Sequence, residues 1–87
     1  MAEIILKIQH EAGLHARPAS LLVQTANRFQ SEISITYNNK RVNGKSILNV
    51  LTLGVHRNAV IIIQAQGEDA DQAISALKYL VENNFEV

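Results

Sequence analysis

Four segments of the chain carry the patterns expected of β-strands: residues 3–9, 32–37, 40–43 and 59–66. In the first two segments apolar and polar residues alternate, so that every second side chain would face a core. The last segment is rich in Val and Ile, which favour strands strongly. Asn38 and Asn39 separate the second and third segments. Because Asn tolerates a positive φ, this pair predicts a hairpin turn.

The first helical segment covers residues 16–29. Its apolar residues recur at spacings of three and four and would form one stripe: Ala19, Leu22, Val23, Ala26 and Phe29. Pro18 would disrupt the interior of a helix but fits its first turn, where the missing N–H has no partner within the helix. The helix is therefore predicted to begin near residue 16, which places His15 at its N-terminal edge.

Two further helices are predicted. Ser46 is placed to cap a short helix over residues 47–53, and Gly54 would end it in the left-handed conformation. Asp69 begins the last helix, and Gln72, three residues later, indicates a capping box. The apolar stripe of that helix would comprise Ala70, Ala73, Ile74, Leu77 and Val81.

The predicted order of elements is βαββαβα, in one domain that spans residues 1–87. Each predicted helix has a single apolar face. Three such helices can cover one face of a four-stranded sheet, which is an α+β architecture.

Composition and charge argue for a globular domain and against several functions. The 87 residues are 47% hydrophobic and 18% charged, and eight basic and eight acidic side chains give a formal net charge of zero. A general nucleic-acid binder usually has a basic excess, and the few aromatic residues do not form stacking pairs for RNA. The absence of cysteine excludes disulfides, thiolate nucleophiles and Cys-based zinc sites.

The N-terminal segment lacks a basic stretch followed by a long apolar run, so it does not have the pattern of a signal peptide. No apolar segment approaches the ~20 residues needed to span a bilayer. We therefore expect a cytoplasmic protein without direct membrane insertion.

The candidate chemistry lies in residues 13–20, Gly-Leu-His-Ala-Arg-Pro-Ala-Ser. The predicted helix start places the imidazole of His15 beside unpaired backbone N–H groups and the positive end of the helix dipole, which favour a bound anion. Arg17 is two residues away, and its guanidinium can hydrogen-bond phosphate oxygens. Gly13 permits a tight approach of the loop backbone. Because imidazole is a nucleophile near neutral pH, attack on phosphorus needs neither a thiol nor a metal.

Spacing alone leaves other interpretations open. His15 is also compatible with an ordinary exposed residue at a purely structural helix start. His10, Glu11 and His15 suggest a metal site, but they do not share a helical face and no fourth ligand is evident, so no metal and no cofactor is predicted. Residues 56–58, His-Arg-Asn, are predicted to be a solvated turn.

The segment Gly-Leu-His-Ala-Arg-Pro-Ala resembles the active-site signature of HPr, the histidine-containing phosphocarrier family of the bacterial sugar phosphotransferase system. The resemblance covers nearly the whole chain through its length, its element order and three further stretches: Val-Asn-Gly-Lys-Ser-Ile at 42–47, Thr-Leu-Gly at 52–54 and Gly-Glu-Asp at 67–69. It implies an open-faced β-sandwich with a four-stranded antiparallel sheet. It also implies a carrier rather than an enzyme. His15 would accept phosphate on Nδ1 from the phosphoenolpyruvate-dependent first enzyme and pass it to sugar-specific acceptor proteins, with Arg17 contacting the phosphate.

Ser46 matches a second site of the family. In the Gram-positive branch the corresponding serine is phosphorylated by an ATP-dependent kinase, so the resemblance implies a serine kinase and phosphorylase and a catabolite-control transcription factor as further partners. The helix dipole would favour a phosphate at this N-cap, although a plain N-cap serine needs no regulation. A purely regulatory relative acting through Ser46 is the main alternative. His15 counts against it, because a related regulatory paralogue lacks the active histidine.

The partner surface is expected around His15, on the first helix away from its apolar stripe and on the short helix, which cannot bury all its apolar side chains. The residues assigned to it are Ala16, Ser20, Leu21, Gln24, Ile47, Leu48 and Leu51. Leu48 is predicted to be an exposed apolar contact beside His15 and Arg17. Three departures from the family pattern leave the partner preference open: Ala12, Asn49 and Asn58.

The family-like sheet order makes the first and last predicted strands neighbours. Ile5, Val60 and Ile62 would then lie together on the face of the sheet that points away from the core. We expect a small exposed apolar patch there, with weak self-association of an otherwise monomeric protein as its consequence.

Overall fold

The computed structural model describes residues 1–86. In chain order the elements are β1 (Ala2–Lys7), α1 (Ala16–Ala26), β2 (Glu32–Tyr37), β3 (Lys40–Asn43), α2 (Ile47–Leu51), β4 (Val60–Gln66) and α3 (Ala70–Glu82). The predicted order βαββαβα is confirmed, and β2 and β3 have the predicted bounds. Within the described part of the chain, no helix combines the length and the apolar character that crossing a bilayer requires.

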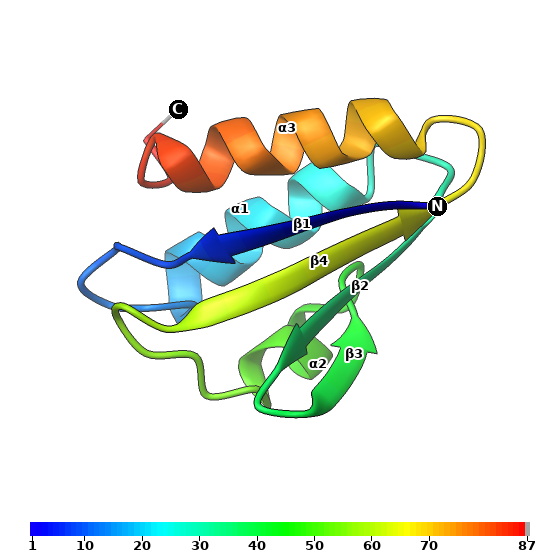
Figure 1. The fold of residues 1–87 in the computed structure, drawn as a ribbon. Helices are drawn as coiled ribbons and strands as arrows, with labels where there is room; N and C mark the ends of the chain where they lie inside the picture. Colours follow the sequence, from blue (N-terminus) through cyan, green and yellow to red (C-terminus); the bar gives the residue numbers. More distant parts are fainter. Residues whose placement is uncertain (87) are drawn as a thin grey trace.

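The four strands form one antiparallel sheet in the order β1-β4-β2-β3. Figure 1 shows β1 beside β4, although most of the chain separates them, and β3 at the opposite edge. The helices lie on one side of the sheet, and α1 and α3 pack against each other there (Figure 1). The predicted α+β open-faced sandwich is therefore confirmed, and one face of the sheet has no helix on it.

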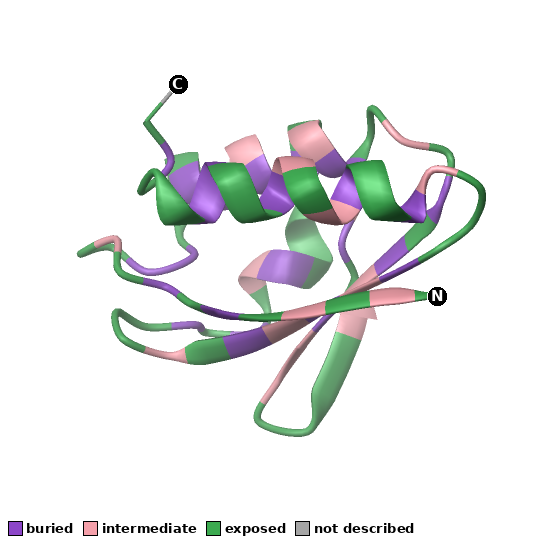
Figure 2. Cartoon of the chain, turned by 45° about the horizontal axis from the view of Figure 1, so that its top comes forward, coloured by how far each residue is buried: buried purple, intermediate pink, exposed green. Residues whose placement is uncertain are grey.

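The core lies between the sheet and the helices, and the alternation along each strand creates its sheet side. In β4, Ile61 and Ile63 have no exposed surface, whereas Val60 points outward and is half exposed. Leu22 of α1 and Leu77 of α3 are fully buried opposite them. Figure 2 shows the same division, with buried and exposed residues alternating along the long helix in front, α3. Each fully buried Ile or Leu contributes roughly 1.5–3 kcal/mol before conformational entropy is subtracted.

The turn and cap residues adopt the conformations that their chemistry predicts. Asn38 and Asn39 have φ values of 54° and 67°, so both central residues of the β2–β3 hairpin are left-handed and match the strand twist. Ser46 is the N-cap of α2, and its Oγ accepts a hydrogen bond from the backbone N–H of Asn49 at 3.4 Å. Gly54 has the predicted left-handed conformation, with φ +64°, but it does not end α2, whose C-cap is Thr52.

Two helices end earlier than predicted. Helix α1 ends at Ala26, because the chain tightens into a turn and the Nδ2 of Asn27 donates to the Val23 carbonyl at 2.9 Å. Phe29 therefore packs against the core from the turn and not from the helix. Helix α2 ends at Leu51, two residues before the predicted end.

The predicted capping box of α3 is wrong. The Asp69 side chain makes no cap hydrogen bond within α3. Its carboxylate instead accepts bonds from the Ser31 hydroxyl, from the Gln30 N–H at 2.8 Å and from the Ser31 N–H at 2.9 Å. The bonds from Ser31 and Gln30 hold the pKa of Asp69 below its ordinary value. This carboxylate therefore joins the start of α3 to the loop before β2. No local sequence pattern predicts this contact, because the partners are far apart in the sequence.

Candidate functional site

His15 is the N-cap residue of α1, and its side chain is exposed. Its backbone is extended, with φ −115° and ψ 161°, and its imidazole makes no capping hydrogen bond, so the ring is free for other chemistry. The position is set by its neighbour Leu14, which is buried and whose N–H donates to the Val55 carbonyl at 3.0 Å. The prediction of an exposed imidazole at the edge of this helix is confirmed.

The N-terminal end of α1 presents an uncompensated positive field beside that imidazole. The N–H groups of Ala16 and Arg17 lie in the first turn, where a helix offers them no partner. No acidic residue occupies this turn, so no side-chain charge opposes the dipole. A small anion bound there would lie next to the His15 ring and would receive backbone hydrogen bonds.

Ala16 has a backbone conformation that sequence reasoning did not predict. Its φ is +30°, in a region that residues with a Cβ rarely occupy. Such a conformation costs about 1–3 kcal/mol and persists only where the surrounding structure enforces it. Here it turns the chain sharply between the His15 imidazole and the Arg17 side chain.

Arg17 is exposed but tethered to the far end of the chain. Its guanidinium donates to the backbone carbonyl of Phe85 at 3.4 Å. Phe85 is fully buried and has φ +61°, and its N–H donates to the Leu80 carbonyl at 2.8 Å. The segment after α3 therefore holds Arg17, the residue predicted to contact the phosphate. No local motif could predict this contact, because the two residues are 68 positions apart in the sequence.

The loop before α1 is braced by His10. Its Nδ1 accepts the N–H of Ala12 at 3.1 Å, and its ring meets the Phe85 ring edge-on, with centroids 6.0 Å apart. Gly13 has φ +65°, and a Cβ at this position would lie 2.2 Å from the Val55 carbonyl oxygen. The tight backbone approach predicted for Gly13 is present. Within residues 1–86, no three His, Cys, Asp or Glu side chains gather as a set of metal ligands.

Ser46 is half-buried at the start of α2, and the preceding residue ties it to α1. The Nζ of Lys45 donates to the Phe29 carbonyl at 2.6 Å, and the Lys45 carbonyl accepts from the Nδ2 of Asn27 at 3.1 Å. These bonds fix α2 against the end of α1, and the two helices contact each other. Residues 56–58 form an exposed turn, as predicted.

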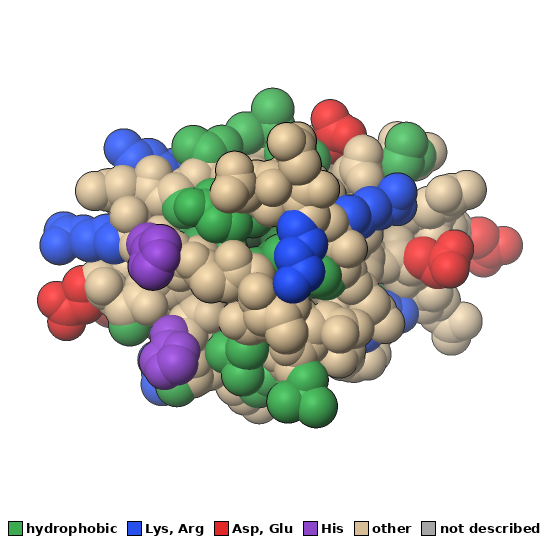
Figure 3. Space-filling view, turned by 90° about the horizontal axis from the view of Figure 1, so that it is seen from below, with side chains coloured by type: hydrophobic (Ala, Val, Ile, Leu, Met, Phe, Trp, Pro, Cys, Tyr) green, Lys and Arg blue, Asp and Glu red, His purple; other side chains and the backbone are tan. Residues whose placement is uncertain are grey.

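The residues expected to meet a partner differ in exposure, and Leu21 and Leu51 pack partly against the core. Leu48 is 74% exposed and Ile47 38%, whereas Leu51 is half-buried. On α1, the Nε2 of Gln24 donates to the Oγ of Ser20 at 3.0 Å at the surface. The other two residues of the set are Ala16, which is exposed, and Leu21, which is half-buried. Figure 3 shows a face on which exposed hydrophobic, histidine and basic side chains lie together, with carboxylates at its margins.

Comparison with known proteins agrees with this geometry. A family model described as the PTS HPr component phosphorylation site matches residues 2–83. A crystal structure of HPr from Thermoanaerobacter tengcongensis is 45% identical, with a TM-score of 0.96 and complete coverage of both chains. The histidine-containing phosphocarrier protein of Mycoplasma is 44% identical, with a TM-score of 0.90 over 97% of each chain. HPr from Bacillus anthracis is 40% identical, with a TM-score of 0.81, over 93% of this chain and 99% of its own.

A match over nearly the whole chain, at this identity and with the same fold, shows common descent and not only a shared topology. The chain therefore belongs to the HPr family, the phosphocarriers of the phosphotransferase system.

Proposed function

We propose that His15 is the residue that carries the phosphoryl group. The observation that carries the proposal is its exposed, uncapped imidazole at the N-terminal end of α1. The unprotonated Nδ1 attacks phosphorus on the phosphorylated first enzyme of the system. The new N–P bond forms as the bond between phosphorus and the donor breaks, and that electron pair returns to the donor. Transfer to a sugar-specific acceptor protein is the same step with the roles exchanged.

The residues around His15 supply charge and position. Phosphoryl transfer depends mostly on positioning and on stabilising charge on the phosphate oxygens. The N–H groups of Ala16 and Arg17 and the dipole of α1 meet those oxygens, and the Arg17 guanidinium adds charge-assisted hydrogen bonds. Because that guanidinium already donates to Phe85 at 3.4 Å, its exchange from carbonyl to phosphate requires only a side-chain movement.

The test is phosphorylation by phosphoenolpyruvate and the first enzyme of the system. The wild-type chain should take up an acid-labile label, and His15→Ala should take up none. His56→Gln removes another exposed imidazole and should label normally, which controls for nonspecific loss. Label that persists in His15→Ala, or that never forms on the wild-type chain, would contradict the proposal.

A regulatory role for Ser46 is supported by its position as the N-cap of α2, where its Oγ accepts from the N–H of Asn49. A phosphate there would meet first-turn N–H groups and would stand beside the Lys45–Asn27 contact with α1. Its partners would be a serine kinase and phosphorylase and a catabolite-control transcription factor.

The Ser46 proposal is tested by incubation with a cognate kinase and ATP. Acid-stable phosphate should appear on the wild-type chain and not on Ser46→Ala. If Ser46→Ala also incorporates acid-stable phosphate, or if the wild-type chain incorporates none, the serine is only a helix cap.

A carrier that shuttles between the first enzyme and its acceptors must reach both, which supports a cytoplasmic protein that works as a monomer. Contact with these proteins is assigned to the exposed side of α1 and to α2. The purely regulatory alternative predicts no labelling by phosphoenolpyruvate, so the His15 experiment separates it from the proposal.

A further inference from the structure

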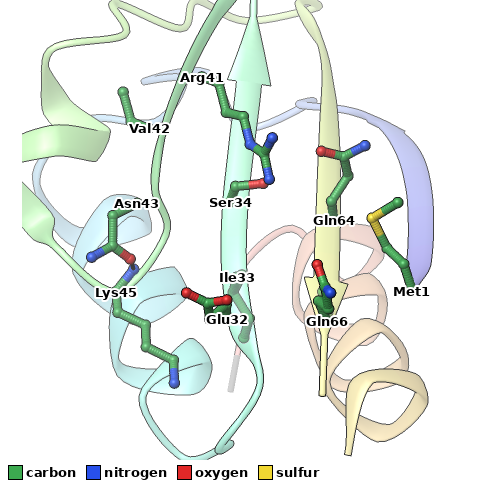
Figure 4. A pocket seen from close by; sticks show the side chains of 11 residues that line it. Met1, Glu32, Ile33, Ser34, Arg41, Val42, Asn43, Lys45, Gln64 and Gln66 are labelled. Atoms are coloured by element: carbon green, nitrogen blue, oxygen red, sulfur yellow. Dashed lines mark hydrogen bonds between the residues drawn. The ribbon is translucent and has the colours of Figure 1, made fainter.

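The bare face of the sheet contains a polar groove that phosphoryl transfer does not use. Its volume is about 510 Å³, within the range of small-molecule sites. The polar side chains along it, drawn in Figure 4, are Glu32, Ser34, Arg41, Asn43, Lys45, Gln64 and Gln66. Neither His15 nor Arg17 lines this groove.

The strand register explains why the sheet is hollow here. Ser34 of β2 pairs with Asn43 of β3 on one side and with Gln64 of β4 on the other. Its short side chain therefore lies between two longer ones on the same face, and the surface sinks at its position. Arg41 lies two pairs further along β3, opposite Thr36, and in Figure 4 its side chain extends along the sheet toward Ser34.

Ser34 has an unmet hydrogen-bonding capacity at the floor of the groove. Its Oγ is inaccessible to solvent and has no hydrogen-bond partner within residues 1–86. A buried hydroxyl without a partner is destabilising, so native structures usually satisfy it. Because the exposed Arg41 side chain borders this position, a ligand that draws the guanidinium aside would open the hydroxyl to a new partner.

The charges along the groove indicate what it would bind. Lys45 lies at one end, but its Nζ already donates to the Phe29 carbonyl at 2.6 Å. The Gln64 amide is similarly engaged, since it donates to Glu3 at 2.6 Å. Arg41 is thus the cation placed to receive an anion, and its planar fork matches a phosphate or carboxylate. Glu32 lines the same groove, so a ligand with one anionic group is favoured over a ligand with several.

We infer that this groove binds a small hydroxylated molecule that carries one phosphate, such as a sugar monophosphate. The Arg41 guanidinium pairs with the phosphate. The Ser34 hydroxyl, the Gln66 amide and the Nδ2 of Asn43 pair with the sugar hydroxyls, which need neutral partners. The Oδ1 of Asn43 already accepts the Lys45 N–H at 2.9 Å. The inference is independent of phosphoryl transfer at His15.

The test is an amide NMR titration of the ¹⁵N-labelled chain with glucose 6-phosphate, with glucose and inorganic phosphate as separate probes. Glucose 6-phosphate should shift the signals of β2, β3 and β4 around Ser34, including the side-chain amides of Asn43 and Gln66. Glucose or phosphate alone should bind at the groove at least about tenfold more weakly, because each lacks half of the recognised groups.

Two variants separate this site from other anion sites. Arg41→Gln should weaken binding at least about tenfold, since it removes the charged partner of the phosphate. Lys7→Gln removes a cation from β1, outside the groove, and should leave the affinity unchanged. His15→Ala should also bind normally, which excludes the helix N-terminus as the source of the shifts.

Three results would overturn the inference. They are the absence of shifts at the groove at millimolar ligand, shifts confined to residues around His15, and equal binding by the wild-type chain and Arg41→Gln. Inorganic phosphate that binds as tightly as glucose 6-phosphate would overturn the assignment of a sugar phosphate.

Discussion

At the scale of single residues, Gly13 and Gly54 show how one backbone conformation can have two different consequences. Both are left-handed, with φ +65° and +64°. A Cβ on Gly54 would meet nothing within 4 Å, whereas on Gly13 it would lie 2.2 Å from the Val55 carbonyl oxygen. Gly13 is therefore required for contact and conformation together, and Gly54 for conformation alone.

This difference gives the first prediction. Gly54→Ala should lower the free energy of unfolding by about 1 kcal/mol, the cost of a left-handed residue with a Cβ. Gly13→Ala should lower it by about 3 kcal/mol, because the backbone must also move away from Val55. Urea unfolding of both variants measures the two losses. Equal losses would show that the contact with Val55 is not needed.

Asp69 gives a prediction about pH at the same scale. Its pKa is lowered below the ordinary value of 3.8, chiefly by the Ser31 hydroxyl and then by the Gln30 N–H. The folded state therefore binds fewer protons than the unfolded state near pH 4. The stability that this carboxylate contributes is present above about pH 4 and is lost as the pH falls through the lowered pKa.

Asp69→Asn should consequently be less stable than the wild-type chain at pH 7, and its stability should depend less on pH between 5 and 2. Thermal unfolding across this range measures both effects. Asp71→Asn changes a carboxylate in the first turn of the same helix and should keep the wild-type dependence. If Asp69→Asn has the wild-type pH profile, the link to Ser31 does not stabilise the fold.

At the scale of elements, α2 illustrates what a five-residue helix can and cannot bury. Val50 is its only buried residue, and Leu48 is 74% exposed on the opposite side. An exposed Leu contributes little to folding but can become the apolar centre of a protein contact. The short helix therefore stabilises its own start through Ser46 and leaves apolar surface for a partner.

Leu48→Asp should lower the rate of phosphoryl transfer from the first enzyme at least about tenfold without unfolding the chain, because it places a charge in the contact. The transfer rate and the urea midpoint measure the two effects separately. Tyr79→Asp changes a similarly exposed side chain, 66% accessible on α3, and should transfer normally. A wild-type rate for Leu48→Asp would remove Leu48 from the contact.

At the scale of the whole molecule, the sheet has one bare face with two different halves. The polar groove occupies one half, and an apolar patch of Ile5, Val60 and Ile62 occupies the other. The register pairs Ile5 with Ile62 across β1 and β4, and Ile5 and Val60 are 63% and 53% exposed. The predicted exposed patch is confirmed, and it includes part of β1, an edge strand with unpaired backbone groups.

Weak self-association through this patch stays a prediction. Sedimentation velocity of the wild-type chain at increasing concentration should show a rising average mass. The double variant Ile5→Thr with Val60→Thr should remain monomeric over the same range. A wild-type chain whose sedimentation does not change with concentration would show that the patch is too small to drive association.

The local patterns of the chain were sufficient for the element order, the hairpin at Asn38-Asn39 and the exposed His15, because periodicity, turn residues and caps act within a few residues. Tertiary structure decided what distant segments contribute. In the folded chain the Arg17 guanidinium donates to the Phe85 carbonyl, and the Asp69 carboxylate accepts from Ser31 and does not cap its own helix. The tertiary structure also produced the hollow at Ser34, which arises only where β3 and β4 flank β2. These contacts join residues that are far apart in sequence, so no spacing in the chain encodes them.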